Sequence, residues 1–204
     1  RWGHLLFGIT WIGLLYYFNF VQGGYFKQAS PEGLSDAKAK LAPSALWWFR
    51  WGAMFTFLTG VYLLVVVYDQ GILNDFTIVG ATLGTLMFLN VWLIIWPNQK
   101  VALGMVAGDG PAAGAKALLA SRTNTLLSGP MAFAMLYSSH GGYAEGHLAS
   151  AGGAGSALWI ALAIIALLEI NAIAGKQGPM TSVKGVITSS IILTAVLVVV
   201  LMFL

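Results

Sequence analysis

Two histidines occupy similar positions near the ends of two apolar stretches, His4 in residues 2–24 and His140 in residues 123–141. Neutral imidazoles from two helices at similar depth are the axial ligands that a b-type haem requires, and helical bundles commonly build cofactor sites from facing helices. The pattern predicts a haem b bound through its iron by His4 and His140. The alternative at either position is a histidine that only meets water or lipid headgroups at the membrane interface.

Copper is a rival cofactor for the second histidine. Met131, Met135 and His140 share one helix, and thioether and imidazole ligands suit Cu(I). The step from Met135 to His140 turns the imidazole off the face that the two methionines share. Copper is therefore less favoured than haem.

Charged and polar side chains in other apolar stretches suggest two further sites. Arg50 and Glu169 are predicted to form an intramembrane pair, because a lone charge at that depth is costly, unless Arg50 extends to the interface by itself. Arg122, Thr123 and Asn124 form a polar cluster that could be a substrate site or a structural feature. The alternative for this cluster is a helix start capped by the preceding serine, with an arginine that sets membrane topology.

The amino-acid composition indicates whether the chain lies in water or in a lipid bilayer. Of 204 residues, 58% are hydrophobic and 8% are charged, whereas about a quarter of the residues in a soluble domain are charged. A helix needs about 20 mostly apolar residues to cross the bilayer. We therefore expect an all-α integral membrane protein with one domain over residues 1–204 and about six transmembrane helices, near residues 2–24, 47–68, 76–97, 123–141, 156–173 and 185–204.

The connections carry the orientation signal. Lysines and arginines concentrate in the first, third and fifth connections, whereas the second and fourth carry none. Basic residues stay on the cytoplasmic side, so we expect both termini on the outer, periplasmic side of a bacterial inner membrane. The Ala-, Lys- and Gly-rich segments 25–44 and 101–122 are expected to lie at the interface.

The same composition excludes several classes of function. The net charge of +3 comes from the loops and includes no basic cluster interleaved with aromatic residues, so nucleic acid is not an expected partner. The absence of cysteine excludes disulfides, zinc ribbons, all-cysteine iron–sulfur clusters and covalently attached c-type haem within these residues.

Four blocks of sequence, taken in order, resemble a known family. They are HLLFGITWIGLLYYFNFVQ at 4–22, RWGAMFTFLTG at 50–60, NVWLIIWPNQK at 90–100 and SRTNTLLSGPMAFAM at 121–135. These blocks are similar to the membrane domain of the bacterial cytochrome-c-linked urate oxidase, or urate hydroxylase, family. The resemblance implies an inner-membrane domain that takes part in urate oxidation and passes electrons to a periplasmic cytochrome c and the respiratory chain.

The chain departs from that family pattern in two ways. It contains no CxxCH haem-attachment motif, and family members are expected to have more helices than six. The alternative is a non-catalytic integral subunit of a larger respiratory or oxygenase complex, which would contact other membrane subunits and lipid through small-residue faces such as Gly80 and Gly84. The sequence leaves open whether the chain is an enzyme and identifies no catalytic residue.

Overall fold

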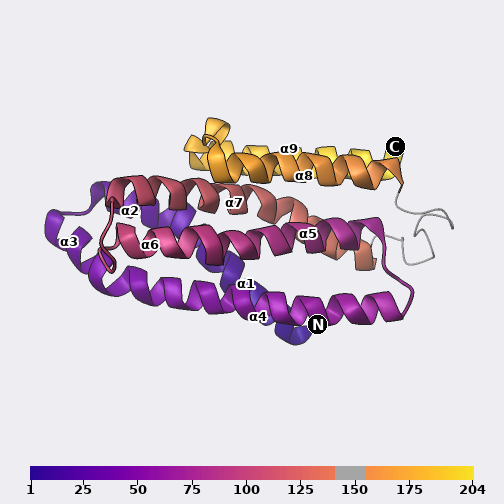
Figure 1. Ribbon diagram of the computed structural model, residues 1–204, viewed down its shortest axis with the longest axis horizontal. Helices are drawn as coiled ribbons and strands as arrows, with labels where there is room; N and C mark the ends of the chain where they lie inside the picture. Colours follow the sequence, from indigo (N-terminus) through magenta and orange to yellow (C-terminus); the bar gives the residue numbers. More distant parts are fainter. Residues whose placement is uncertain (141–154) are drawn as a thin grey trace.

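The computed structural model describes residues 1–140 and 155–204, and all regular structure in these ranges is helical. The helices lie side by side as six long rods (Figure 1). In chain order the rods are α1 (Trp2–Tyr16) with η1 (Tyr17–Gln22) and α2 (Gly23–Gln28); α3 (Pro31–Asp36) with η2 (Ala37–Leu41) and α4 (Ala42–Asp69); α5 (Asp75–Leu89) with η3 (Asn90–Ile95) and α6 (Trp96–Ala102); α7 (Gly110–His140); α8 (Ser156–Ala174); and, after the short η4 (Gly178–Thr181), α9 (Val183–Phe203).

The expected all-α fold is confirmed for the described residues, and five of the rods are long and apolar enough to cross a membrane. They are Trp2–Gln28, Pro31–Asp69, Asp75–Ala102, Ser156–Ala174 and Val183–Phe203. The remaining rod, α7, is 31 residues long but too polar to belong to this group. Its residues 123–128 are all buried, because the helix packs between α5 and α9 and against α1. Side chains that face protein instead of lipid need not be apolar.

The start predicted for α7, near residue 123, is wrong. We expected residues 101–122 to lie at the interface, but α7 already begins at Gly110, where the Asp109 carboxylate accepts a hydrogen bond from the Ala112 amide at 3.0 Å. Ala117 and Ala120 on the added turns are fully buried. Small side chains let α7 approach its neighbours closely, so the alanine-rich composition reflects helix packing.

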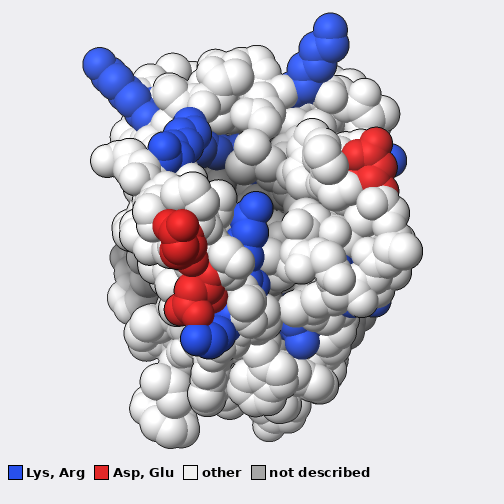
Figure 2. All heavy atoms as spheres, turned by 90° about the vertical axis from the view of Figure 1, so that its left-hand side faces the viewer, with Lys and Arg blue, Asp and Glu red and all other residues white. Residues whose placement is uncertain are grey.

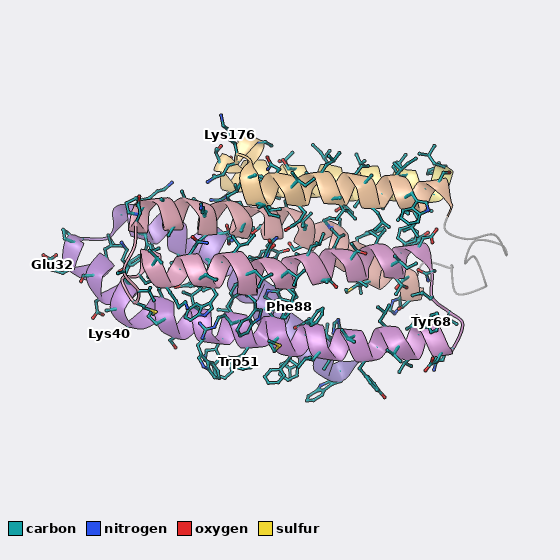
Figure 3. All side chains as sticks on the ribbon, viewed as in Figure 1. Glu32, Lys40, Trp51, Tyr68, Phe88 and Lys176 are labelled. Atoms are coloured by element: carbon teal, nitrogen blue, oxygen red, sulfur yellow. The ribbon has the colours of Figure 1, made fainter. Side chains whose placement is uncertain are left out.

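Lysines and arginines gather on one end face of the bundle (Figure 2). Glu32, Lys40 and Lys176 lie toward this end, and Tyr68 lies at the opposite end (Figure 3). The C-terminus lies at the end of the bundle opposite the lysines, and α1 begins beside the middle of α4 (Figure 1). This segregation of charge is the one used above to predict topology. Which side of the membrane each end faces stays a prediction.

Two π-helical segments place polar side chains inside the bundle. Asn19 and Gln22 are buried on η1, and Asn90 is buried at the start of η3. A π-helical turn inserts an extra residue into an α-helix, which redirects the side chains that follow, and such turns are frequent at functional sites. The buried amides of Asn19, Gln22 and Asn90 therefore lie on π-helical turns.

Candidate functional site

His4 packs against α4. Its Nδ1 lies 3.0 Å from the Thr56 carbonyl oxygen and 3.2 Å from Thr59 Oγ1. A carbonyl oxygen can only accept, so Nδ1 carries the proton in this contact and Nε2 presents a lone pair. The ring also lies over Gly60, where an added Cβ would be 3.1 Å from His4 Cε1. An imidazole whose Nδ1–H is held by a backbone carbonyl has the protonation state of a metal ligand.

His140 is held differently, at the exposed end of α7. Its Nδ1 lies 3.1 Å from the Leu136 carbonyl oxygen of its own helix. The start of α1 and the end of α7 lie apart in Figure 1, and the hydrogen bonds of the two imidazoles reach different elements. The two imidazoles have separate partners, and their pairing around a haem stays a prediction. His147, a third histidine near this end of the sequence, falls outside the described residues.

Fit to a haem is therefore partial. His4 alone has a fixed tautomer inside a helix–helix contact, while His140 is exposed on another rod. Among residues 1–140 and 155–204, no group of three or more His, Asp or Glu side chains is arranged to hold a metal ion. A haem iron needs only two protein ligands, so a haem b on His4 and His140 stays a prediction.

The two methionines considered as copper ligands fill the contact between α5 and α7. A Cβ added at Gly80 would lie 3.0 Å from Met135 Cγ, and one at Gly84 would lie 3.6 Å from Met131 Sδ. The Gly80 and Gly84 face, which we expected to contact another subunit, is thus covered by the chain's own α7. Methionine is a common filler of irregular gaps in cores.

Arg50 and Glu169 have separate partners. The Arg50 guanidinium lies 3.5 Å from the centre of the Trp96 ring, while Glu169 Oε2 lies 3.1 Å from Asn90 Nδ2. The one ion pair found among the described residues is that between Lys40 and Asp36. The predicted pair is not formed, because the guanidinium is instead satisfied by an aromatic face on the third rod.

The predicted cluster of Arg122, Thr123 and Asn124 is divided among different surroundings. The Thr123 hydroxyl donates to the Leu119 carbonyl of the same helix at 3.1 Å. Asn124 points into the α5 contact and is 0% exposed. Arg122 Nε and Nη1 are buried and have no hydrogen-bond partner in the described part of the chain. Three consecutive helical residues point in directions about 100° apart, so they rarely share one site.

A site that sequence reasoning missed lies where three rods meet. Asn90 on η3 donates from Nδ2 to Asn124 Oδ1 on α7 at 3.0 Å and to Glu169 Oε2 on α8 at 3.1 Å. Asn124 Nδ2 in turn donates to the Met87 carbonyl at 2.9 Å. We call these three side chains, Asn90, Asn124 and Glu169, the amide–carboxyl cluster. All three are polar residues in apolar stretches, but nothing in the sequence indicates that they meet.

A second polar contact joins α1 to α7. Asn19 Nδ2 donates to Ser121 Oγ at 2.8 Å, and the hydroxyls of Tyr16 and Ser128 lie 2.8 Å apart. Buried hydrogen bonds of this kind hold transmembrane helices in a fixed register. The polar face of α7 therefore has a packing role on this side and faces the amide–carboxyl cluster on another.

One family model matches a range of the chain that contains the amide–carboxyl cluster. Residues 73–203 match the family model described as urate oxidase N-terminal. No curated protein and no solved structure matches the chain. The match includes Arg122 and the whole amide–carboxyl cluster, as well as the third and fourth sequence blocks quoted above, whereas His4 and Arg50 precede it. Since the match covers well over half of the chain, the chain belongs to the urate oxidase N-terminal family.

Proposed function

We propose that this chain is the membrane domain of a urate-oxidising oxidoreductase of the bacterial inner membrane, and that it passes electrons to a periplasmic cytochrome c. The observation that carries the proposal is the family match over residues 73–203. The five rods that are apolar enough to span a membrane support a multi-pass location. Urate and cytochrome c are water-soluble, so the chain would act on them at the membrane surfaces.

Arg122 is the proposed contact for the urate anion. Arg122 is half-buried, and its Nε and Nη1 are buried without a hydrogen-bond partner among the described residues. Buried N–H groups without acceptors are unfavourable unless a ligand supplies them. A planar anion with carbonyl and nitrogen acceptors matches the planar fork of arginine. Thr123 and Asn124 are proposed to act only by fixing α7, since each is engaged within the protein.

The experiment is an assay of urate-dependent cytochrome c reduction. Membranes containing the full chain are compared with membranes lacking it, and then with Arg122→Gln and Lys116→Gln. Lys116 lies on the same helix and is exposed, so its substitution removes one positive charge without touching Arg122. We expect reduction that depends on urate, a marked rise in KM for Arg122→Gln and little change for Lys116→Gln.

The same assay separates the alternative function. A non-catalytic subunit predicts no urate-dependent reduction, together with other membrane proteins that co-purify with the chain in mild detergent. That result would contradict the proposed oxidoreductase domain. Equal KM values for urate in Arg122→Gln and Lys116→Gln would contradict the contact between Arg122 and urate. They would leave the proposed oxidoreductase function standing.

A haem b is proposed as a further component, with His4 as its ligand. The support is the free Nε2 lone pair that the contact with Thr56 imposes. When bound, a haem would supply one-electron transfer. A reduced-minus-oxidised spectrum with a pyridine haemochrome assay tests this: we expect a b-type band that His4→Ala removes and His140→Ala retains. No haem, or loss of the band in both variants, would contradict this assignment.

A further inference from the structure

Glu169 is an acidic side chain inside a membrane-spanning rod that the proposed function does not use. It lies on α8, is half-buried, and reaches Asn90, which is 1% exposed. Ionisable groups in transmembrane helices are rare because their charge is costly there, and those that occur usually serve transport or proton transfer. The cluster therefore calls for a role beyond packing.

The backbone fixes the direction of every hydrogen bond in the amide–carboxyl cluster. The Met87 carbonyl can only accept, so Asn124 must point its Nδ2 toward Met87 and its Oδ1 toward Asn90. Asn90 must then present its Nδ2, and this amino group also faces Glu169 Oε2. The carboxyl group thus always meets a donor on this side.

That single neutral donor is the only hydrogen-bond partner of the Glu169 carboxyl among the described residues. Within residues 1–140 and 155–204, no Lys, Arg or His nitrogen lies within 4.0 Å of it. The titratable groups on the elements packed against α8 are Asp75 on α5, Lys116, Arg122, Tyr137 and His140 on α7, and Lys184 on α9. A half-buried carboxylate without a cation partner is relieved of the cost of its charge by taking up a proton.

We propose that Glu169 is a proton-exchanging carboxyl group of the membrane interior, held in position by Asn90 and Asn124. In the step, the carboxylate takes a proton from a hydronium ion, leaving water, and the neutral acid later returns that proton to water. The Asn90 amino group stays a donor throughout, so the free carboxyl oxygen is the one that gains and loses the proton.

A role for this proton in catalysis rests on the proposed function. Oxidation of urate releases protons as well as electrons, and cytochrome c accepts only the electrons. An internal carboxyl group would give the protons a defined acceptor. Proton exchange at Glu169 can be measured without urate, so its failure and failure of the proposed function are separate results.

The experiment uses the full chain in lipid nanodiscs and a hydrophobic carbodiimide, which modifies protonated carboxyl groups in apolar surroundings. Labelling of each acidic residue is read by peptide mass spectrometry between about pH 5 and pH 9, the range over which buried carboxyl groups titrate. We expect Glu169 to be labelled strongly at the acid end and progressively less as the pH rises. Glu32, which is exposed on α3, serves as the internal control and should label weakly throughout.

Two variants test the assignment. Glu169→Gln keeps the shape and should lose labelling at this position only. Asn90→Leu removes the donor that stabilises the ionised form, so labelling of Glu169 should persist to higher pH.

Three results would overturn the proposal: no labelling of Glu169 at any pH, labelling that does not change with pH, or protection by sodium ions at constant pH. Protection by sodium would identify a metal-cation site in place of a proton site. The wild-type pH profile alone decides the matter if Asn90→Leu fails to fold.

Discussion

His4 near the start of α1 lies against Gly60 of α4, with the imidazole Cε1 3.1 Å from the place that a Cβ would occupy on the glycine. The contact explains why α4 carries a glycine at this level. It also holds the ring where its Nδ1 reaches the Thr56 carbonyl oxygen. The orientation of His4 therefore depends on the absence of a side chain one rod away.

Gly60→Ala should be less stable than Gly13→Ala by about 1 kcal/mol, because the methyl group at Gly60 crowds the imidazole while both variants gain the same helix propensity. The measurement is the free energy of unfolding in mixed detergent micelles. Gly13→Ala is the matched control, since a Cβ there meets nothing within 4 Å and alanine favours the helix. Equal stability of the two variants would show that the ring moves aside freely.

Gly129→Ala should destabilise the contact between α7 and α9, because its Cβ would collide with Ser190 Oγ. That hydroxyl donates to the Leu126 carbonyl at 2.8 Å, so it cannot rotate away without losing a buried hydrogen bond. Adding Ser190→Ala removes the colliding oxygen and leaves Ser190 Cβ at 3.6 Å, an ordinary contact. We expect the double variant to be more stable than Gly129→Ala alone, as measured by thermal unfolding; a less stable double variant would refute this packing.

Asn90 and Asn124 should show an interaction free energy of about 1 kcal/mol in a double-mutant cycle with leucine, since hydrogen bonds between membrane helices have about this strength. Asn124→Leu leaves Asn90 bonded only to Glu169 among the described residues, and Asn90→Leu leaves Asn124 bonded only to the Met87 carbonyl. The cycle therefore isolates the bond between the two amides. Asn98→Leu is the control, because the side-chain partner of Asn98 among the described residues is the Ile94 carbonyl of its own rod. A cycle without coupling would mean that the Asn90–Asn124 bond makes no net contribution.

Arg50 should couple to Trp96 and not to Glu169. A cycle of Arg50→Met with Trp96→Leu should give about 1 kcal/mol, the usual scale of a partly shielded cation–π contact. The cycle of Arg50→Met with Glu169→Gln should give additive changes within error. Coupling in the second cycle would revive the ion pair that the sequence suggested.

Hydropathy was sufficient to predict most of the fold. Five rods follow directly from apolar length, because a span exposed to lipid must be apolar along its whole course. The same reasoning failed at α7, whose first turns contain Ala113, Ala117 and Ala120. Alanine-rich segments look similar whether they lie on a membrane surface or inside a tight bundle, and only the neighbours distinguish the two.

Polar residues inside the spans were identified correctly, but their partners were not. Asn90 and Glu169 are separated by 79 residues. Arg50 and Trp96 lie on different rods, and the sequence does not indicate that these rods are neighbours. Depth in the membrane can be read from position along a span. Which side chains meet at that depth depends on the order of helices around the bundle, and hydropathy contains no information on it.

The enclosed position of α7 has a consequence for how the protein is made. A helix that carries Asn124, Thr125 and Ser128 in its buried middle is not retained in a bilayer by its own affinity for lipid. It leaves the ribosome before α8 and α9, so α1 and α5 are the neighbours available to shelter it first. In a bilayer, the packing of α7 against α8 and α9 would be completed only after these later helices have been made.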